Sequence, residues 1–186
     1  FKMGTNWGHG MFKYSACDYC DDIVGEVSDI SIGDAWLKKY TADYKGNSAV
    51  VVRNDILDRI LKKGHNNNDL SLENVDAKVI RESQAGGIRH KRDDLQYRLA
   101  VKEKEKQWYP PKRVNPGEDH LTRNRKKIVE LRVKIAELSH ILFFEAMERG
   151  RLEYYYKKIK LYLVKYEIRY NGFSKYLKRR LINIIK

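Results

Sequence analysis

Two cysteines, Cys17 and Cys20, are the residues of this chain best suited to carry out chemistry. They are the only cysteines in the sequence, and a structural disulfide between neighbours this close would close almost no loop. Closely spaced thiolates instead suit a metal ion, an iron–sulfur cluster or a redox dithiol. Two ligands cannot complete a tetrahedral zinc site or a four-thiolate cluster, so further ligands are required from elsewhere. Inert thiols are the alternative.

The remaining sequence contains no other catalytic motif. None of the histidines has a zinc-finger spacing from the cysteines, and surface histidines or histidines with satisfied hydrogen bonds are expected. They are His9, His65, His90, His120 and His140. The absence of a Walker loop, a GxGxxG motif and a Ser/His/Asp grouping argues against hydrolase and nucleotide-kinase functions.

Small residues follow a predicted strand downstream of the cysteines. Residues 27–32 alternate apolar and small polar side chains, which predicts a half-buried strand that Gly33 and Asp34 end. Residues 49–52 are apolar, which predicts a strand covered on both faces. Gly33 would let the backbone approach a cofactor, and Trp36 offers a flat apolar face. A plain turn and a core tryptophan are the alternatives.

Helical spacing of apolar residues dominates the rest of the chain. Residues 56–61 predict a helix ending near Gly64, and residues 70–79 predict a short extended segment. Two longer helices with one apolar seam are predicted from steps of three and four. Their seam residues are Ile128, Leu131, Ile135, Leu138, Leu142, Leu152, Tyr155, Ile159, Tyr162 and Tyr166. A last short basic helix is predicted to end in Leu181, Ile184 and Ile185.

The three prolines, all within residues 110–116, mark a boundary because they cannot continue a helix. We therefore predict a domain over residues 1–107, a linker over residues 108–120 and a basic helical arm over residues 121–186. The predicted fold class is α+β, with a small mixed β-sheet core and flanking helices, followed by the basic helical C-terminal arm.

The formal charge of +13 is concentrated in the arm, where residues 121–186 carry 18 Lys and Arg against six Glu, a net charge of +12. Tyr154–Tyr156 precede two lysines, a mixture that suits lipid headgroups or stacked bases. Packing on the body or on a partner is favoured, peripheral membrane contact comes next, and nucleic acid is not expected as a partner.

The expected compartment is the cytoplasm, with peripheral membrane contact as an addition. No signal region and no run of eighteen apolar residues is present, and the cysteine pair suits a reducing environment. Because the chain begins at Phe1 without an initiator methionine, we expect a segment of a longer protein.

Three stretches together resemble the C-terminal signature of the coenzyme F-420 hydrogenase/dehydrogenase beta-subunit family. They are Cys17–Cys20, Val24–Trp36 and Lys45–Arg53. In that family a cysteine pair precedes an Ala-Asp-Ile-Ser-type strand with a glycine turn, and a Gly-x-Ser element opens an apolar strand ending in Arg. The similarity runs from about Phe12 to Leu99 and includes Gln84–Gly87. Gly46-Asn47-Ser48 stands where hydrogenase-type members often have Gly-Trp-Ser, which favours the bacterial branch.

The resemblance implies an iron–sulfur flavoprotein oxidoreductase that transfers electrons between a redox partner protein or ferredoxin and a flavin or deazaflavin acceptor. It implies FAD, coenzyme F-420 as a further cofactor, and a 4Fe-4S cluster with Cys17 and Cys20 as ligands and the other thiolates in an upstream part. A link to polysaccharide biosynthesis follows from the bacterial branch. The expected cofactor-binding residues are Gly33, Asp34, Trp36, Gly46 and Ser48. The alternative is a non-catalytic interaction module that docks through its basic helical arm.

Overall fold

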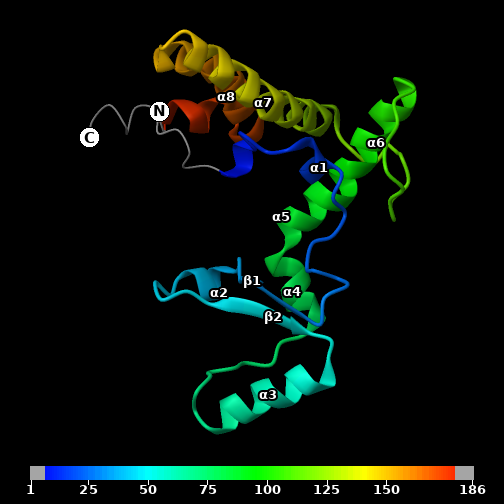
Figure 1. Ribbon diagram of the computed structural model, residues 1–186, viewed down its shortest axis with the longest axis vertical. Coiled ribbons are helices and arrows are strands. Elements are labelled where there is room, and N and C mark those ends of the chain that lie inside the picture. Colours follow the sequence, from blue (N-terminus) through cyan, green and yellow to red (C-terminus); the bar gives the residue numbers. More distant parts are fainter. Residues whose placement is uncertain (1–6, 179–186) are drawn as a thin grey trace. The chain divides into compact units, whose positions relative to one another are not determined.

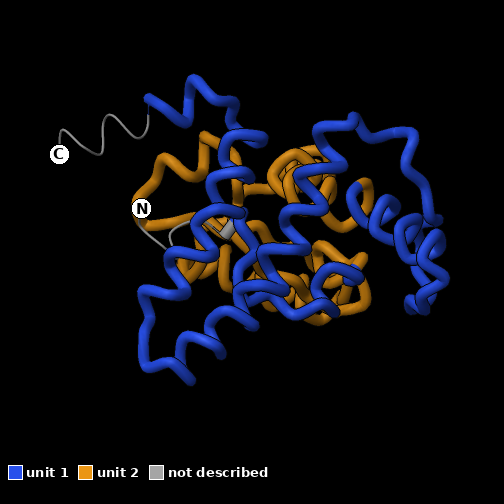
Figure 2. Tube along the Cα trace, turned by 90° about the horizontal axis from the view of Figure 1, so that it is seen from above, with its two compact units in different colours: residues 1–20, 94–186 blue, residues 21–93 orange. Residues whose placement is uncertain are grey.

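The computed structural model describes residues 7–178 (Figure 1). The chain divides into two compact units, which Figure 2 distinguishes by colour. The first unit contains residues 1–20 and 94–186, and the second contains residues 21–93. The expected α+β class is confirmed, because helices predominate and one small sheet is present.

The first unit is built on a helical hairpin of α7 (Arg123–Glu148) and α8 (Leu152–Asn171). The Thr122 hydroxyl caps the start of α7 by accepting a hydrogen bond from the Arg125 amide at 3.2 Å. Gly150, with a φ of 59°, turns the chain between the two helices. Apolar side chains from both helices fill the space between them. The buried core residues are Ile128, Ile135, Leu142, Ala146, Tyr155, Ile159, Leu163 and Tyr166.

Two further segments pack on this hairpin within the first unit. The N-terminal segment, with 3-10 helix η1 (Trp7–His9) and helix α1 (Ser15–Asp18), contacts α7. In this segment the Phe12 amide donates to Ser139 Oγ at 2.7 Å. Helix α6 (Asp94–Lys104) also contacts α7, and Arg125 Nε donates to the fully buried Asp94 carboxylate at 2.8 Å. The predicted arm is therefore part of a packed unit that includes the cysteine segment.

The second unit contains a two-stranded antiparallel sheet, β1 (Ile30–Asp34) with β2 (Ser48–Val52). In the sequence of this unit, helices lie between the two strands and after them. They are α2 (Lys38–Thr41), α3 (Asp55–Asn66), α4 (Ala77–Ser83), α5 (Ala85–Ile88) and the π-helix η2 (Arg89–Asp93). The expected mixed sheet is wrong for the described residues, because the one strand pair there is antiparallel. The valines of β2 are half-exposed and not covered on both faces, since a two-stranded sheet has too little covering structure.

Several predicted boundaries in the second unit are also corrected. Strand β1 includes Gly33 and Asp34, because its ladder with β2 continues past them. Helix α3 passes through Gly64 and is capped by Asn67, and Leu70 folds back over Gly64, where a Cβ would come within 3.0 Å of its side chain. Residues 70–76 form no strand, and helix α4 begins at Ala77.

The region around the prolines contains neither helix nor strand over residues 107–122, which agrees with an irregular connection. The division into residues 1–107, 108–120 and 121–186 stays a prediction. The two compact units are defined by contacts between residues, which do not test domain boundaries along the sequence. Residues 173–178 are helical, and Leu181, Ile184 and Ile185 lie outside the described residues. Within residues 7–178, no helix is both long enough and apolar enough to cross a membrane.

The hairpin core predicts a loss of stability at alkaline pH. Tyr155 is 1% exposed, and burial raises its pKa to about 12, against about 10 in an unfolded chain. As the pH rises above about 10, the phenol ionises in the unfolded chain but stays neutral in the folded protein. The free energy of unfolding therefore falls until the pH passes about 12, where the folded protein ionises too. We expect Tyr155→Phe to lessen the alkaline loss of unfolding free energy by on the order of 2 kcal/mol. Urea unfolding across this pH range, with exposed Tyr44→Phe as the control, measures it; equal curves for both variants would contradict it.

Candidate functional site

The cysteine pair lies on a tight turn at the end of a short helix. Cys17 belongs to α1 and Cys20 follows the helix, with Tyr19 between the helix end and the second thiol. The Cys17 amide donates to the Tyr14 carbonyl at 3.0 Å, and the Tyr19 amide donates to Ala16 at 3.1 Å. Neither cysteine is in a disulfide, and Cys17 is exposed while Cys20 is half-buried. The turn thus presents a thiol pair at the surface of the first unit.

A buried ion pair holds the cysteine turn on its interior side. Asp18, between the two cysteines, is 4% exposed and forms an ion pair with Lys13. Arg98 on α6 is also buried, and its Nε donates to the Asp18 main-chain carbonyl at 2.8 Å. Burial lowers the pKa of Lys13 and of Arg98, while the Asp18 carboxylate opposes that change. The position of the thiols therefore depends on charged groups that are costly to bury unless they stay paired.

A groove of about 930 Å³ runs beside the cysteine turn, between the N-terminal segment, α6 and α7. Tyr14, Tyr19 and Tyr97 contribute aromatic walls. Lys102 lies over the Tyr19 ring at 5.9 Å, and burial raises the pKa of Tyr19. The Tyr97 hydroxyl donates to a Glu130 carboxylate oxygen at 2.7 Å, and burial followed by this bond raises the Tyr97 pKa. The sequence carried no signal for this groove, because its walls come from distant segments.

One buried polar atom on the groove wall has no partner. His140 Nε2 is buried without a hydrogen-bond partner, and the ring packs between Phe12 and Tyr14, with centroid distances of 5.6 and 5.7 Å. The sequence predicted surface or satisfied histidines, and for His140 this prediction is wrong, because its ring is packed among aromatic side chains while Nε2 has no hydrogen-bond partner.

The cysteines supply an incomplete metal site. Within residues 7–178, no three His, Cys, Asp or Glu side chains are grouped to hold a metal ion. The donor chemistry nevertheless fits iron, because two accessible thiolates on one turn match two of the four ligands that a 4Fe-4S cluster needs. The other two ligands would have to come from outside this set.

The predicted cofactor-binding residues all belong to the second unit, and all five are exposed. Gly33 and Asp34 lie in β1, opposite Ala49 and Ser48 of β2. A Cβ added to Gly33 would meet nothing within 4 Å, so the surface beside this strand is open. Trp36 is 64% exposed and is therefore not a core residue. Gly46, with a φ of 82°, ends the turn that leads into β2.

The chain after β1 is held by the end of helix α4, which sequence reasoning did not assign to the site. The Trp36 amide donates to the buried Ser83 hydroxyl at 2.8 Å. The Gln84 side chain donates to the Asp34 carbonyl at 2.8 Å. Gln84 belongs to the Gln84–Gly87 segment that the sequence had added to the resemblance. Cofactor binding by the five predicted residues stays a prediction.

A separate pocket of about 600 Å³ lies in the second unit between β2 and α4. Its walls include the three valines of β2, Ile80 and Arg81. None of the five predicted residues lines it. A cofactor that contacted only these five residues would therefore lie outside this pocket.

Comparison with known protein families gave one match. Residues 3–78 match the family described as the C terminus of the coenzyme F420 hydrogenase/dehydrogenase beta subunit. No curated protein and no solved structure matched the chain. The match includes Cys17, Cys20 and both strands, and it ends before the Gln84–Gly87 segment that the sequence had added to the resemblance. Residues 3–78 are therefore similar to the C-terminal domains of coenzyme F420 hydrogenase/dehydrogenase beta subunits, the family that the sequence was predicted to resemble.

Proposed function

We propose that this protein is an iron–sulfur flavoprotein oxidoreductase that transfers electrons in the cytoplasm. The observation that carries the proposal is the Cys17–Cys20 pair, which forms no disulfide, is not fully buried, and lies inside the family match on a turn fixed by Asp18. The family supports an oxidoreductase-related role.

In this proposal Cys17 and Cys20 are two ligands of a 4Fe-4S cluster whose other thiolates come from an upstream part of a longer protein. When bound, such a cluster accepts and donates single electrons. The chain's own contribution is positional. Arg98 and Lys13 hold Asp18, and the Asp18 turn keeps one thiol on each side of a buried anchor. Ligands held by buried side chains need little reorganisation when they bind.

The open surface at the end of β1 is proposed as one wall of an FAD site. Gly33 allows a ring or phosphate to approach the backbone, because the adjoining space is empty. Trp36 offers an exposed aromatic face whose backbone is fixed by Ser83. Asp34, Gly46 and Ser48 complete this wall, and its other side would come from a separate segment.

Electrons would pass between a redox partner protein or ferredoxin and a flavin or deazaflavin acceptor, with coenzyme F-420 as one such acceptor. The Gly46-Asn47-Ser48 sequence supports the bacterial branch of the resemblance and a role in polysaccharide biosynthesis. The competing function is a non-catalytic interaction module that docks through its helices. The net charge of +12 over residues 121–186, on the helices through which such a module would dock, favours this competitor.

Cofactor content distinguishes the two functions. We expect the full-length protein, purified without oxygen, to contain about four irons per cluster together with FAD. Gly33→Val should lower flavin content and leave iron unchanged, because valine suits a strand but blocks the open backbone surface. Thr41→Val places the same side chain elsewhere on the second unit and should retain flavin. A folded protein that contains neither iron nor flavin would support the interaction module instead.

A further inference from the structure

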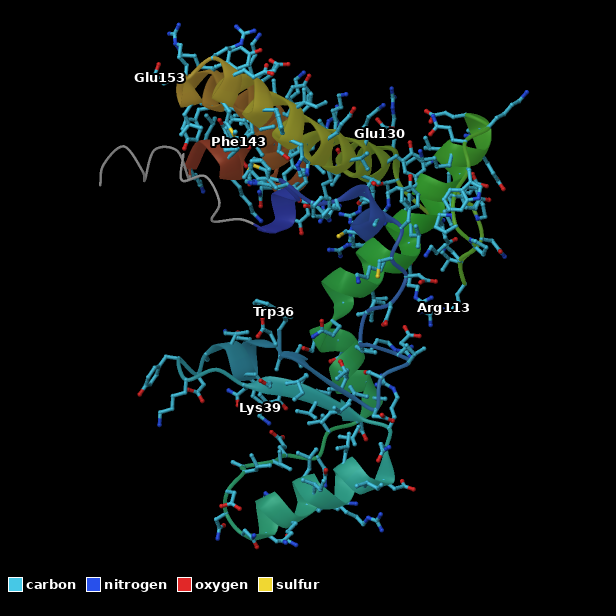
Figure 3. All side chains as sticks on the ribbon, in the orientation of Figure 1. Trp36, Lys39, Arg113, Glu130, Phe143 and Glu153 are labelled. Carbon is cyan, nitrogen blue, oxygen red and sulfur yellow. The ribbon has the colours of Figure 1, made fainter. Side chains whose placement is uncertain are left out.

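The turn end of the α7–α8 hairpin exposes large apolar side chains. We call residues 143–160 the hairpin tip; in Figure 3, the labelled Phe143 and Glu153 belong to it. Phe144 is 67% exposed and Met147 is 60% exposed, both in the last turns of α7. Leu152 and Tyr156, in the first turns of α8, are 48% and 45% exposed. These four side chains form no part of the hairpin core.

Helix geometry explains why Phe144 cannot join that core. Each residue advances about 100° around an α-helix, so Phe144 lies about 200° from its core neighbours Leu142 and Ala146. Leu142 and Ala146 are 8% and 2% exposed and already fill the interhelical space with Tyr155. The exposure of Phe144 is therefore built into the helix, and no change of rotamer removes it.

Cations surround these apolar side chains. The exposed ones are Arg149, Arg151, Lys157, Lys158 and Lys160. The Arg149 guanidinium lies 4.4 Å from the Tyr154 ring centroid, and Lys158 Nζ lies 5.8 Å from the same centroid. Three acidic residues share the tip. Of these, Glu145 accepts a hydrogen bond from the Tyr154 hydroxyl, while Glu148 and Glu153 are exposed.

The positive charge extends beyond the tip, because residues 121–186 carry a net charge of +12. An exposed apolar group with aromatic residues and a cationic rim is the composition of segments that bind at the membrane–water interface. Two grooves of this unit, each about 930 Å³, are lined by residues outside the tip. The exposed apolar side chains of the tip therefore lie outside both grooves, on a convex turn whose cationic rim is complementary to an anionic surface.

We propose that the hairpin tip docks on an anionic lipid bilayer. Phe144, Met147 and Leu152 enter the interfacial layer, and the surrounding lysines and arginines contact anionic headgroups. This contact is independent of the redox chemistry, since it uses none of the residues assigned to the cluster or the flavin. It gives the electron-transfer protein a defined place at a membrane surface.

Co-sedimentation of the full-length protein with vesicles tests this proposal. The vesicles contain phosphatidylcholine alone or phosphatidylcholine with phosphatidylglycerol, each at low and high salt. We expect binding to the anionic vesicles that weakens with salt. Replacing Phe144 and Met147 together by serine should weaken binding by roughly tenfold. Replacing Lys157 and Lys160 together by glutamate should weaken it by at least about tenfold.

Matched changes in the second unit serve as controls. Tyr44, which is 93% exposed, is replaced by serine, and the exposed Lys45 and Lys63 are together replaced by glutamate. Both controls should bind anionic vesicles like the parent. Circular dichroism confirms that every variant is folded, as expected for exposed positions. Equal binding to neutral vesicles, no binding to anionic vesicles, or equal losses in tip and control variants would each overturn the proposal.

Discussion

Replacing either Cys17 or Cys20 with serine is expected to reduce the iron and sulfide content of the full-length, anaerobically purified protein to background. Serine keeps the size of the side chain but replaces a soft thiolate with a hard hydroxyl, which is a poor ligand for iron–sulfur clusters. Neither thiol is in a disulfide and neither is fully buried, so the change leaves the packed unit intact. Iron and sulfide analysis with the visible spectrum measures the loss.

The matched control is Ser15→Ala, which changes an exposed residue of the same short helix and removes no sulfur. This control should retain its iron. Flavin should remain in all three variants, because the predicted flavin residues belong to the second unit. Parental iron content in both serine variants would show that the pair does not bind the cluster.

The helical hairpin was predictable because its signal is local. Apolar residues at steps of three and four must fall on one side of a helix, and Ile135, Ile159 and Tyr166 are indeed buried between α7 and α8. Leu152 follows the same spacing but is 48% exposed. It is the first residue of α8, next to the turn between the two helices, and periodicity alone does not show where a helix has no packing partner.

The boundaries of β1 were less predictable, because side chains compete with the strand ladder. Residues 27–29 continue the alternating pattern, yet Val27 is fully exposed. The Ser28 hydroxyl donates to the Gly25 carbonyl at 2.6 Å and its amide donates to the same carbonyl at 2.9 Å, which forms a turn instead. At the other end, Gly33 was expected to break the strand. Its pairing with Ala49 outweighs the weak strand preference of glycine.

The support of the candidate site could not be predicted, because it depends on contacts distant in sequence. Cys17 and Cys20 were recognisable from their type and spacing. Their anchor Arg98 lies 80 positions beyond Asp18, and no periodic pattern connects the two. The same applies to Phe12, whose ring lies 5.6 Å from that of Phe143 on α7. A single sequence reports which residues are apolar or reactive, but it does not report which distant element packs against them.

Replacing Arg98 with methionine is therefore expected to have the largest effect on stability among changes near the site. Methionine keeps the apolar stem but takes the guanidinium donor away from the Asp18 carbonyl and removes one of the cations beside the buried carboxylate. Breaking a buried ion pair in this way costs about 3–5 kcal/mol. Urea unfolding followed by circular dichroism measures the change in unfolding free energy.

Lys104→Met is the matched control on the same helix. Its side chain is 64% exposed and forms an ion pair with Glu118, so its loss should cost less than about 1 kcal/mol. Arg98→Lys should lie between the two, since it keeps the charge but loses the planar group that reaches the carbonyl.

The thiols report whether the loss is local to the cysteine turn. In the reduced, metal-free protein, exposed Cys17 should be alkylated faster than half-buried Cys20. If Arg98 holds the turn through Asp18, Arg98→Met should accelerate alkylation of Cys20 under native conditions and bring the two rates together. Lys104→Met should leave both rates unchanged. A small loss of stability with unaltered rates would show that the turn is held by its own hydrogen bonds and not by the buried charges beneath it.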